Sequence, residues 1–441
     1  MTIKKLNYER VNKRYIKIIW LYLFLLIFEG AIRRWILPSL STPLLVVRDP
    51  IVIVLVLIAI RKGWLESSIA KFIMFLSTIS FIMTLLVGHQ NLLADIYGWR
   101  IYFFYVPFSF LVGKFLSMSD LLKIGRFILY LSIPMTLLII IQFYSPQSAW
   151  VNRGVGGDLE GAGFSGALGY FRPPATFSFT AGYICFQLLV GCFLFYFLLM
   201  NALLPIKERI GSWYLGISVF CYIITIPFSI SRTHFFQTIV LILFAFVGAF
   251  FREKTRTRLL LVSFIIFFFF IAFINLNASA EGMSAFIDRF DSASQSEGGI
   301  QGTLLDRYIG AIGRGLDDGF PFWGYGLGFG TNVGAKLLGY ENMYSKFNSD
   351  QEWSRVFGEC GFLIGIGIMF LRMYFSFWFF KVSWLALKIK SNVLPWIFAP
   401  AIFIAFAMGQ FNATSNLGFA VLITGFGLAS LKGFNNKEYL K

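Results

Sequence analysis

The chain has 441 residues, of which 57% are hydrophobic and only 14% are charged. Soluble globular domains carry about 25% charged residues, so this composition excludes an ordinary soluble enzyme and predicts an all-α protein of the membrane. The formal net charge of +16 is scattered between apolar runs, a pattern typical of membrane topology and contact with anionic lipid and not of nucleic-acid binding.

Apolar runs of roughly 20 residues, long enough to cross the hydrocarbon of a bilayer, recur along the whole chain, which we treat as one membrane domain, 1–441. The first run follows a basic segment but has no small-residue cleavage site, so it predicts an uncleaved helix and not a signal peptide. We expect about 12 membrane-spanning helices, near 16–36, 43–60, 69–88, 96–116, 122–144, 176–200, 211–228, 233–251, 258–275, 353–380, 393–411 and 416–432.

Lysine and arginine are concentrated in one alternate set of the short loops between these spans. Twelve spans put both chain ends on the same side of the membrane as those loops. Positively charged loops face the cytoplasm, so the sequence predicts a multi-pass protein with cytoplasmic termini.

Two long loops are predicted on the opposite, extracytoplasmic face, at 145–175 and 276–352. Structureless loops of such length are uncommon and are often functional. Within the second, residues 303–316 have the periodicity of an amphipathic helix, expected either on the outer membrane surface or against the helix bundle. The glycine-rich run 324–330 lacks both the dinucleotide spacing and the lysine of a phosphate-binding loop, so it predicts a close-packing turn.

Arginine outnumbers lysine near the extracytoplasmic ends of the predicted spans. A guanidinium stays charged when desolvated and binds phosphate oxygens at two points, so this excess favours an anionic ligand that contains phosphate. Arg172 lies at the mouth of a predicted span, and Arg232 lies in a polar break between two predicted helices. Because neither has an acidic neighbour in the sequence, they are the strongest candidates for ligand binding.

Structural ion pairing is the alternative for other outer arginines. A charged arginine at the centre of a membrane helix costs about 2.5–3.5 kcal/mol, which an acidic partner offsets. Three arginines have an acidic residue nearby in the sequence: Arg48 beside Asp49, Arg100 after Asp95, and Arg33 one turn after Glu29. For these three, ion pairing and ligand binding both stay open.

Four segments follow one another in a characteristic order. They are Arg172-Pro-Pro-Ala-Thr-Phe, Ser231-Arg232-Thr233, the stretch from Arg307 through Gly324-Tyr-Gly-Leu-Gly, and Asp350-Gln-Glu-Trp-Ser-Arg-Val-Phe-Gly-Glu359-Cys-Gly361. In this order they resemble the bacterial O-antigen polymerase and O-antigen ligase family, over about residues 145–370.

The resemblance implies a GT-C-like glycosyltransferase of the bacterial inner membrane that needs no metal and no cofactor. Such an enzyme takes a glycan from undecaprenyl pyrophosphate and joins it to an acceptor sugar at the periplasmic face. Its expected partners are this lipid-linked oligosaccharide as donor and acceptor, the bilayer and a chain-length regulator. Ligases of the family carry histidine where this chain has Asp350, which favours a polymerase of O-antigen or exopolysaccharide. An O-antigen ligase and an oligosaccharyltransferase stay open.

The expected roles follow from this resemblance and from the chemistry of the residues. Arg172, Arg232 and Arg307 are expected to bind the donor pyrophosphate, and Asp350 to take the proton of the acceptor hydroxyl. Supporting candidates are Arg48, Arg100, Arg314, Arg355, Glu359 and His234, the last as an alternative base. A flippase or transporter of the same lipid is the alternative from another class, because buried charges among many spans also suit alternating access.

Overall fold

The computed structural model describes residues 2–161, 163–251, 280–296, 319–339, 352–432 and 434, without the side chains of 2–11 and 293–296. The predicted span 258–275 and the predicted amphipathic helix 303–316 lie outside these ranges. Within them the chain is mainly helical, and its one sheet is a two-stranded hairpin.

Helices account for all the predicted spans that fall in the described ranges. The α-helices of the described part are α1 (Thr2–Ala31), α2 (Ser41–Leu44), α3 (Asp49–Arg61), α4 (Ser68–Val87), α5 (Leu92–Arg100), α6 (Val106–Phe115), α7 (Met118–Tyr144), α8 (Thr180–Met200), α9 (Ser212–Phe228), α10 (Arg232–Phe250), α12 (Ala280–Ser296), α14 (Asn332–Leu338), α15 (Glu352–Lys390), α16 (Val393–Ile402) and α17 (Thr414–Ser430), of which α12 and α14 lie in the predicted loop 276–352. Three π-helical turns, Ile32–Ile36, Ile101–Tyr105 and Phe403–Ala407, follow α1, α5 and α16. Eight helical segments of the described part are long and apolar enough to cross a bilayer.

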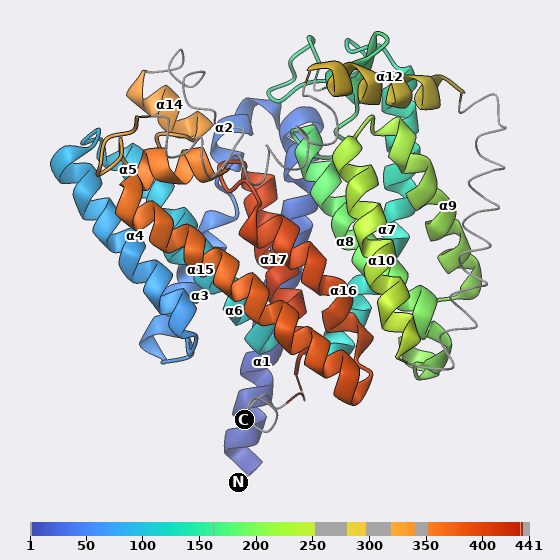
Figure 1. Ribbon diagram of the computed structural model, residues 1–441, viewed down its shortest axis with the longest axis horizontal. Helices are drawn as coiled ribbons and strands as arrows, with labels where there is room; N and C mark the ends of the chain where they lie inside the picture. Colours follow the sequence, from blue (N-terminus) through green and yellow to red (C-terminus); the bar gives the residue numbers. More distant parts are fainter. Residues whose placement is uncertain are drawn as a thin grey trace.

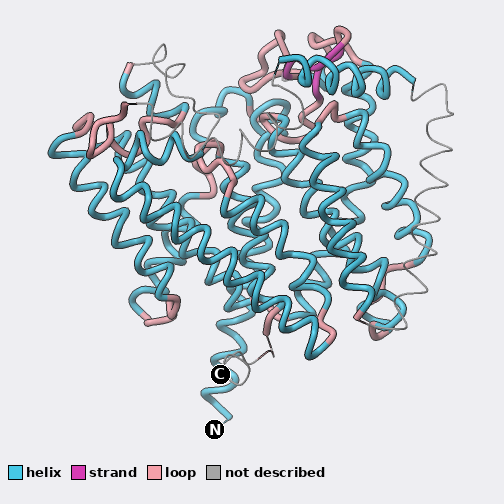
Figure 2. Tube along the Cα trace, in the orientation of Figure 1, coloured by secondary structure: helices cyan, strands magenta, loops and turns pink. Residues whose placement is uncertain are grey.

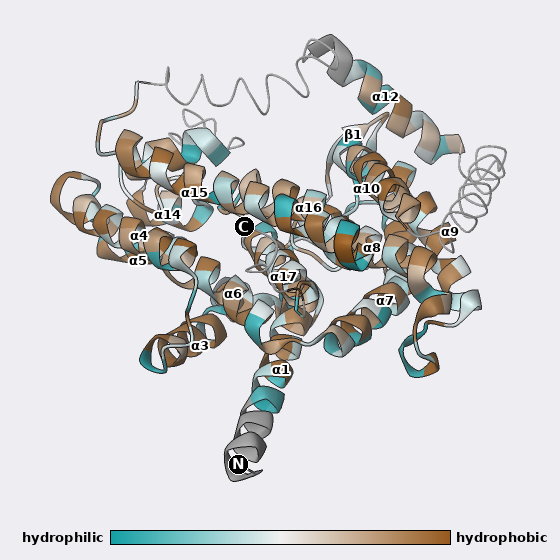
Figure 3. Cartoon of the chain, turned by 60° about the horizontal axis from the view of Figure 1, so that its bottom comes forward, coloured by the Kyte–Doolittle hydropathy of each residue, from teal (hydrophilic) through white to brown (hydrophobic). Residues whose placement is uncertain are grey.

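The helices form a bundle in which α8 is central. Of the most apolar 18-residue window of α8, 89% is buried, and the helix packs against α7, α9, α10, α16 and α17. Hydrophobic residues also cover helices at the edges of the bundle, such as α4 and α9 (Figure 3). Phe75, Leu137 and Phe370 are among the large apolar side chains exposed there. A bundle that is apolar both inside and outside is what a lipid environment requires.

The N-terminal end of α1 and the C-terminal end of α17 lie at one end of the bundle (Figure 1). After α17, the ammonium group of Lys432 donates to the carbonyls of Lys114 and Leu116 at the end of α6, at 2.5 Å each. The opposite end carries α12, α14 and the hairpin of β1 (Phe164–Ala167) and β2 (Tyr170–Arg172), which lies beside α12 in Figure 2. The hairpin was not predicted; it is antiparallel and pairs Phe164 with Arg172.

Helix α12 covers the outer ends of the hairpin and of α9 and α10. Its Phe286 ring packs edge-on against Phe235 of α10, with ring centroids 5.9 Å apart. The hydroxyl of Tyr170 in β2 donates to the Glu281 carboxylate at 2.7 Å. This helix lies before the segment predicted to be amphipathic, and the sequence analysis did not anticipate it.

The glycine-rich run 324–330 forms the predicted turn. Gly324, Gly326 and Gly328 have φ angles of 76°, 114° and 85°, which residues with a side chain rarely adopt. The turn packs so closely on α5 that a Cβ on Gly98 would overlap the backbone of Gly328. The prediction of a close-packing turn is confirmed.

Replacing Gly98 with alanine is expected to lower the free energy of unfolding by about 1–3 kcal/mol, the usual cost of overpacking a close contact. Backbone atoms of the turn, which cannot rotate away, would meet the new methyl group. Unfolding of the purified protein by SDS titration measures the effect. Gly216 of α9 is the matched control, because a Cβ there meets nothing within 4 Å. If the alanine variants of Gly98 and Gly216 were both as stable as the parent protein, the close contact between Gly98 and the turn would be contradicted.

The turn also fits into a break in α15. At Gly361 the backbone leaves the helical conformation, with φ 73° and ψ 176°. The amides of Tyr325 and Gly326 donate to the carbonyls of Gly358 and Glu359, at 2.7 and 3.1 Å. The turn therefore replaces the helical hydrogen bonds that the break removes, and it fixes the first segment of α15.

His89, in the loop between α4 and α5, holds the same turn from the other side. Its Nδ1 accepts from the amide of Asn91 at 3.0 Å, so Nε2 carries the proton and donates to the carbonyl of Leu327 at 2.9 Å. Burial lowers the pKa of His89, which keeps the ring neutral at pH 7. We therefore assign His89 a structural role.

Candidate functional site

A polar cavity of about 270 Å³ lies where the N-terminal ends of α8, α10, α15 and α17 meet. Its lining includes Arg172 of β2, Ser231 and Thr233 on either side of Arg232, and Glu352 at the start of α15. Unpaired backbone N–H groups and the helix dipole make a helix N-terminus attractive to anions. Four such ends and an arginine therefore favour negative charge in this cavity.

A second, apolar cavity of about 510 Å³ adjoins the first. The two cavities share four lining residues: Thr233, Gln237, Ile404 and Met408. Arg232 is the one charged side chain in the lining of the apolar cavity that the described residues provide. Phe377 and Phe380 of α15 also line it and are 59% and 40% exposed, so the cavity opens sideways between α10 and α15.

A residue with a strained backbone lies close to each of the two arginines, three residues after Arg172 and two residues before Arg232. Ala175 has a φ of 52° and Ile230 a φ of 46°, values that are rare outside glycine and genuine outliers for a β-branched residue. Such conformations persist only where the surroundings enforce them, and they are common at functional sites. At Ala175 the enforcing group is Gln142, whose side chain accepts from the Ala175 amide at 2.8 Å and donates to its carbonyl at 3.1 Å.

Arg34 holds the segment that leads into α8. It is fully buried in the π-helical turn that follows α1. Its guanidinium donates to four backbone carbonyls, those of Arg153 at 2.6 Å, Ala175 at 2.8 Å, Val151 at 3.1 Å and Phe177 at 3.2 Å. An arginine saturated in this way does not bind ligand; it fixes the loop that carries Arg172.

Buried ion pairs occupy three other outer arginines of the first half of the chain. The pairs are Arg33 with Glu29 at 3.2 Å, Arg48 with Glu29 at 3.0 Å, and Arg100 with Asp49 at 2.9 Å. For Arg33, where ion pairing and ligand binding were both open, the structure shows the pair with Glu29. Arg48 does not pair with the adjacent Asp49, nor Arg100 with Asp95 five residues before it, because only residues three or four apart face each other on a helix surface. Neither Arg48 nor Arg100 lines either cavity.

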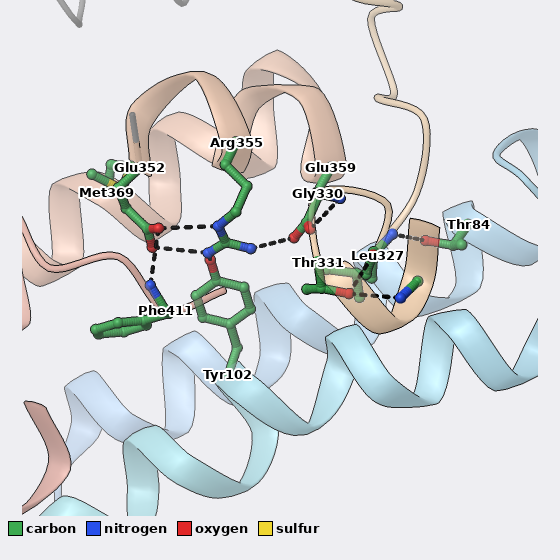
Figure 4. A network of polar contacts seen from close by, with 12 residues as sticks. Thr84, Tyr102, Leu327, Gly330, Thr331, Glu352, Arg355, Glu359, Met369 and Phe411 are labelled. Carbon is green, nitrogen blue, oxygen red and sulfur yellow. Dashed lines mark hydrogen bonds and ion pairs between the residues drawn. The ribbon is translucent and has the colours of Figure 1, made fainter. Parts of the chain in front are cut away.

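Arg355 and Glu359 form a buried network in the first segment of α15 (Figure 4). The Arg355 guanidinium donates to Glu352 at 2.8 and 3.0 Å, to Glu359 at 2.6 Å and to the hydroxyl of Tyr102 at 2.8 Å. Glu359 also accepts from the amide of Gly330 at 2.9 Å. Both are fully buried, so they position the start of α15 and do not touch a ligand.

Glu352 connects this network to the cavity wall. Its carboxylate also accepts from Arg372 at 2.5 Å and from the amide of Phe411 at 3.1 Å. Arg372 in turn donates to the carbonyls of Phe406 and Gly409, at 2.8 and 2.7 Å. The pair thus fixes the loop that closes one side of the polar cavity. Sequence reasoning missed both residues, although a lone arginine deep in a predicted span is a recognisable signal.

His234 does not reach the cavities. It is fully buried in α10 and packs edge-on against Tyr222, with ring centroids 5.3 Å apart, and it lines neither cavity. Arg307, Arg314 and Asp350 lie outside the described residues. The structure therefore brings two of the expected site residues, Arg172 and Arg232, to one pair of joined cavities.

Comparison with models of known protein families finds no match, and no curated protein sequence matches the chain. The chemistry of the two joined cavities is therefore the basis for inferring a function.

Proposed function

We propose that this protein is a GT-C-like membrane glycosyltransferase that polymerises O-antigen or exopolysaccharide repeat units. Its donor is an oligosaccharide on undecaprenyl pyrophosphate, and the reaction takes place at the periplasmic face of the bacterial inner membrane, with twelve spans and cytoplasmic termini. One observation carries the proposal: an arginine-containing polar cavity joins an apolar cavity that opens to the side. A lipid diphosphate has the same two parts.

The polar cavity suits the diphosphate. Arg172 lines it, and Arg232 lies between two of its lining residues and in the wall of the adjoining cavity. The charge of Glu352 is balanced by Arg355 and Arg372, so it does not cancel the two arginines. Guanidinium groups and helix N-termini then face the phosphate oxygens together.

The apolar cavity suits the polyprenyl tail. Phenylalanine side chains of α10 and α15, such as Phe236, Phe244 and Phe377, form much of its wall. Each CH₂ group buried from water contributes about 0.8 kcal/mol, but a carrier already in the bilayer gains little by this transfer. The sideways opening instead allows the carrier to enter the site without leaving the membrane.

In the proposed reaction, the acceptor hydroxyl oxygen attacks the anomeric carbon of the donor sugar. The bond from that carbon to the diphosphate oxygen breaks, its electron pair goes to the leaving diphosphate, and the hydroxyl proton goes to Asp350. Arg172 and Arg232 stabilise the charge that grows on the leaving group, which lowers the barrier because they bind it more strongly than the ground state. The roles of Asp350 and of Arg307 stay predictions from the sequence.

Replacing both Arg172 and Arg232 with lysine is expected to reduce polymer formation at least 10²-fold, since removal of one preorganised donor costs about 10²–10³ in rate. Lysine keeps the charge but loses the two-point contact. The measurement is the length distribution of polysaccharide on gels from a strain that lacks the native gene, with the variant at equal abundance. Arg126 of α7 is the control, because it donates to the carbonyl of Lys207 in an exposed contact away from the cavities.

Unchanged long-chain polymer in the double variant would overturn the proposal. The same strain separates a polymerase from a flippase. Loss of a polymerase leaves single repeat units exposed at the periplasmic face, whereas loss of a flippase leaves lipid-linked units at the cytoplasmic face.

A further inference from the structure

We infer that Gln237 and Trp353 recognise the first sugar of the donor lipid, and that they select a sugar carrying both a hydrogen-bond donor and an acceptor next to the diphosphate. A hydroxyl and an acetamido group both have this chemistry. The inference rests on the proposed function and deepens it, because it assigns the group adjacent to the diphosphate.

Gln237 lies at the junction of the two cavities. It is on α10, is 6% exposed and lines both of them. Its side-chain oxygen is buried and has no hydrogen-bond partner among the described residues. Leaving a buried acceptor unsatisfied is unfavourable, so this oxygen is expected to gain a donor when the cavity is filled.

The diphosphate cannot supply that donor. A diphosphate esterified at both ends is fully ionised at neutral pH and offers only acceptor oxygens. Sugar hydroxyl and amide groups are the donors that the proposed substrate carries nearby. Gln237 follows Thr233 by four residues, so their side chains lie on the same face of α10, with Cβ atoms about 5–6 Å apart. That separation is comparable to the width of one sugar ring.

Trp353 provides the complementary group. Its indole N–H is buried, also has no hydrogen-bond partner within the described ranges, and belongs to a residue that lines the polar cavity. An indole N–H can only donate. A buried acceptor and a buried donor at one cavity together match a ligand group that both donates and accepts.

The chain contains a matched control for Gln237. Gln187 of α8 is 1% exposed, and its side-chain oxygen likewise has no partner in the described part of the chain. It lines neither cavity, and its amide nitrogen donates to the Tyr183 hydroxyl. If an unsatisfied buried glutamine were only a feature of packing, the two would behave alike.

The test measures lipid binding to the purified full-length protein in nanodiscs. The probes are farnesyl diphosphate and the same lipid carrying galactose or N-acetylglucosamine. We expect at least one sugar-linked probe to bind the parent protein about tenfold more tightly than farnesyl diphosphate, since one buried hydrogen bond has an effect of this order. Tighter binding of the galactose probe alone would indicate that the site recognises a hydroxyl group. Tighter binding of the N-acetylglucosamine probe alone would indicate that it recognises an amide group.

Gln237→Met is expected to abolish this tenfold difference in affinity between the sugar-linked probes and farnesyl diphosphate. Gln187→Met is expected to preserve the difference. Gln237→Asn, which withdraws the amide by one CH₂ group, replaces the methionine variant if that variant does not fold.

Equal affinity of the parent protein for all three probes would overturn this inference, as would a tenfold difference that survives in the Gln237 variant. In both cases binding of farnesyl diphosphate leaves the proposed function intact. Failure of the parent protein to bind any of the three probes would overturn the proposed function and this inference with it.

Discussion

Glu352→Gln is expected to lower the free energy of unfolding by about 3–5 kcal/mol, the usual cost of breaking a buried ion pair by removing one partner. The carboxylate accepts hydrogen bonds from Arg355, Arg372 and the amide of Phe411. A glutamine amide has one acceptor oxygen and would turn its own N–H₂ group toward those donors. The two buried arginines would then share only the charge of Glu359.

The measurement is again unfolding by SDS titration. Glu66→Gln is the control, because Glu66 pairs with Lys114 but its side chain is 80% exposed. Exposed ion pairs contribute about 0–1 kcal/mol. If Glu352→Gln lowered the free energy of unfolding no more than this control and only slowed catalysis, Glu352 would act in the reaction and would not be a structural residue.

Arg34→Met is expected to have an effect of similar size, about 3 kcal/mol or more, because each backbone carbonyl left unsatisfied costs about 1–3 kcal/mol. Four carbonyls between Val151 and Phe177 would each lose a hydrogen bond, although Gln142 would still donate to those of Val151 and Ala175. Lysine cannot replace arginine here, since one ammonium group does not span four acceptors. We expect the loop at 145–175 to become sensitive to protease added to the purified protein in nanodiscs.

The control is Arg126→Met, which also removes an arginine that donates to backbone carbonyls, but in an exposed contact. If the loop were as resistant to protease in the Arg34 variant as in this control, the loop would not depend on Arg34 for its conformation.

The helical elements were predictable because a membrane imposes a simple rule: each span must be a long apolar run with its backbone satisfied internally. This rule fixed the positions of helices such as α4 and α7. It says nothing of short polar segments outside the hydrocarbon, and the hairpin 164–172 and α12 were therefore missed. Both depend on contacts distant in sequence, such as that between Tyr170 and Glu281.

The candidate site was predictable in part for the same kind of reason. Arg172 and Arg232 were recognisable because they stand without acidic neighbours at breaks between apolar runs. The partners of the other arginines were not, since Arg48 and Arg100 pair with acids 19 and 51 residues away in sequence. Gln237 was overlooked because one polar residue in an apolar run carries no sign of the cavity it faces.

The sideways opening of the apolar cavity has a consequence for the carrier. Under the proposed function, only the isoprene units nearest the phosphates need contact protein, and the distal units can stay solvated by neighbouring acyl chains. Under the proposed function, turnover should then depend little on carrier length beyond the first few units. Spent carrier would diffuse away within the leaflet while the growing glycan stays in the periplasm.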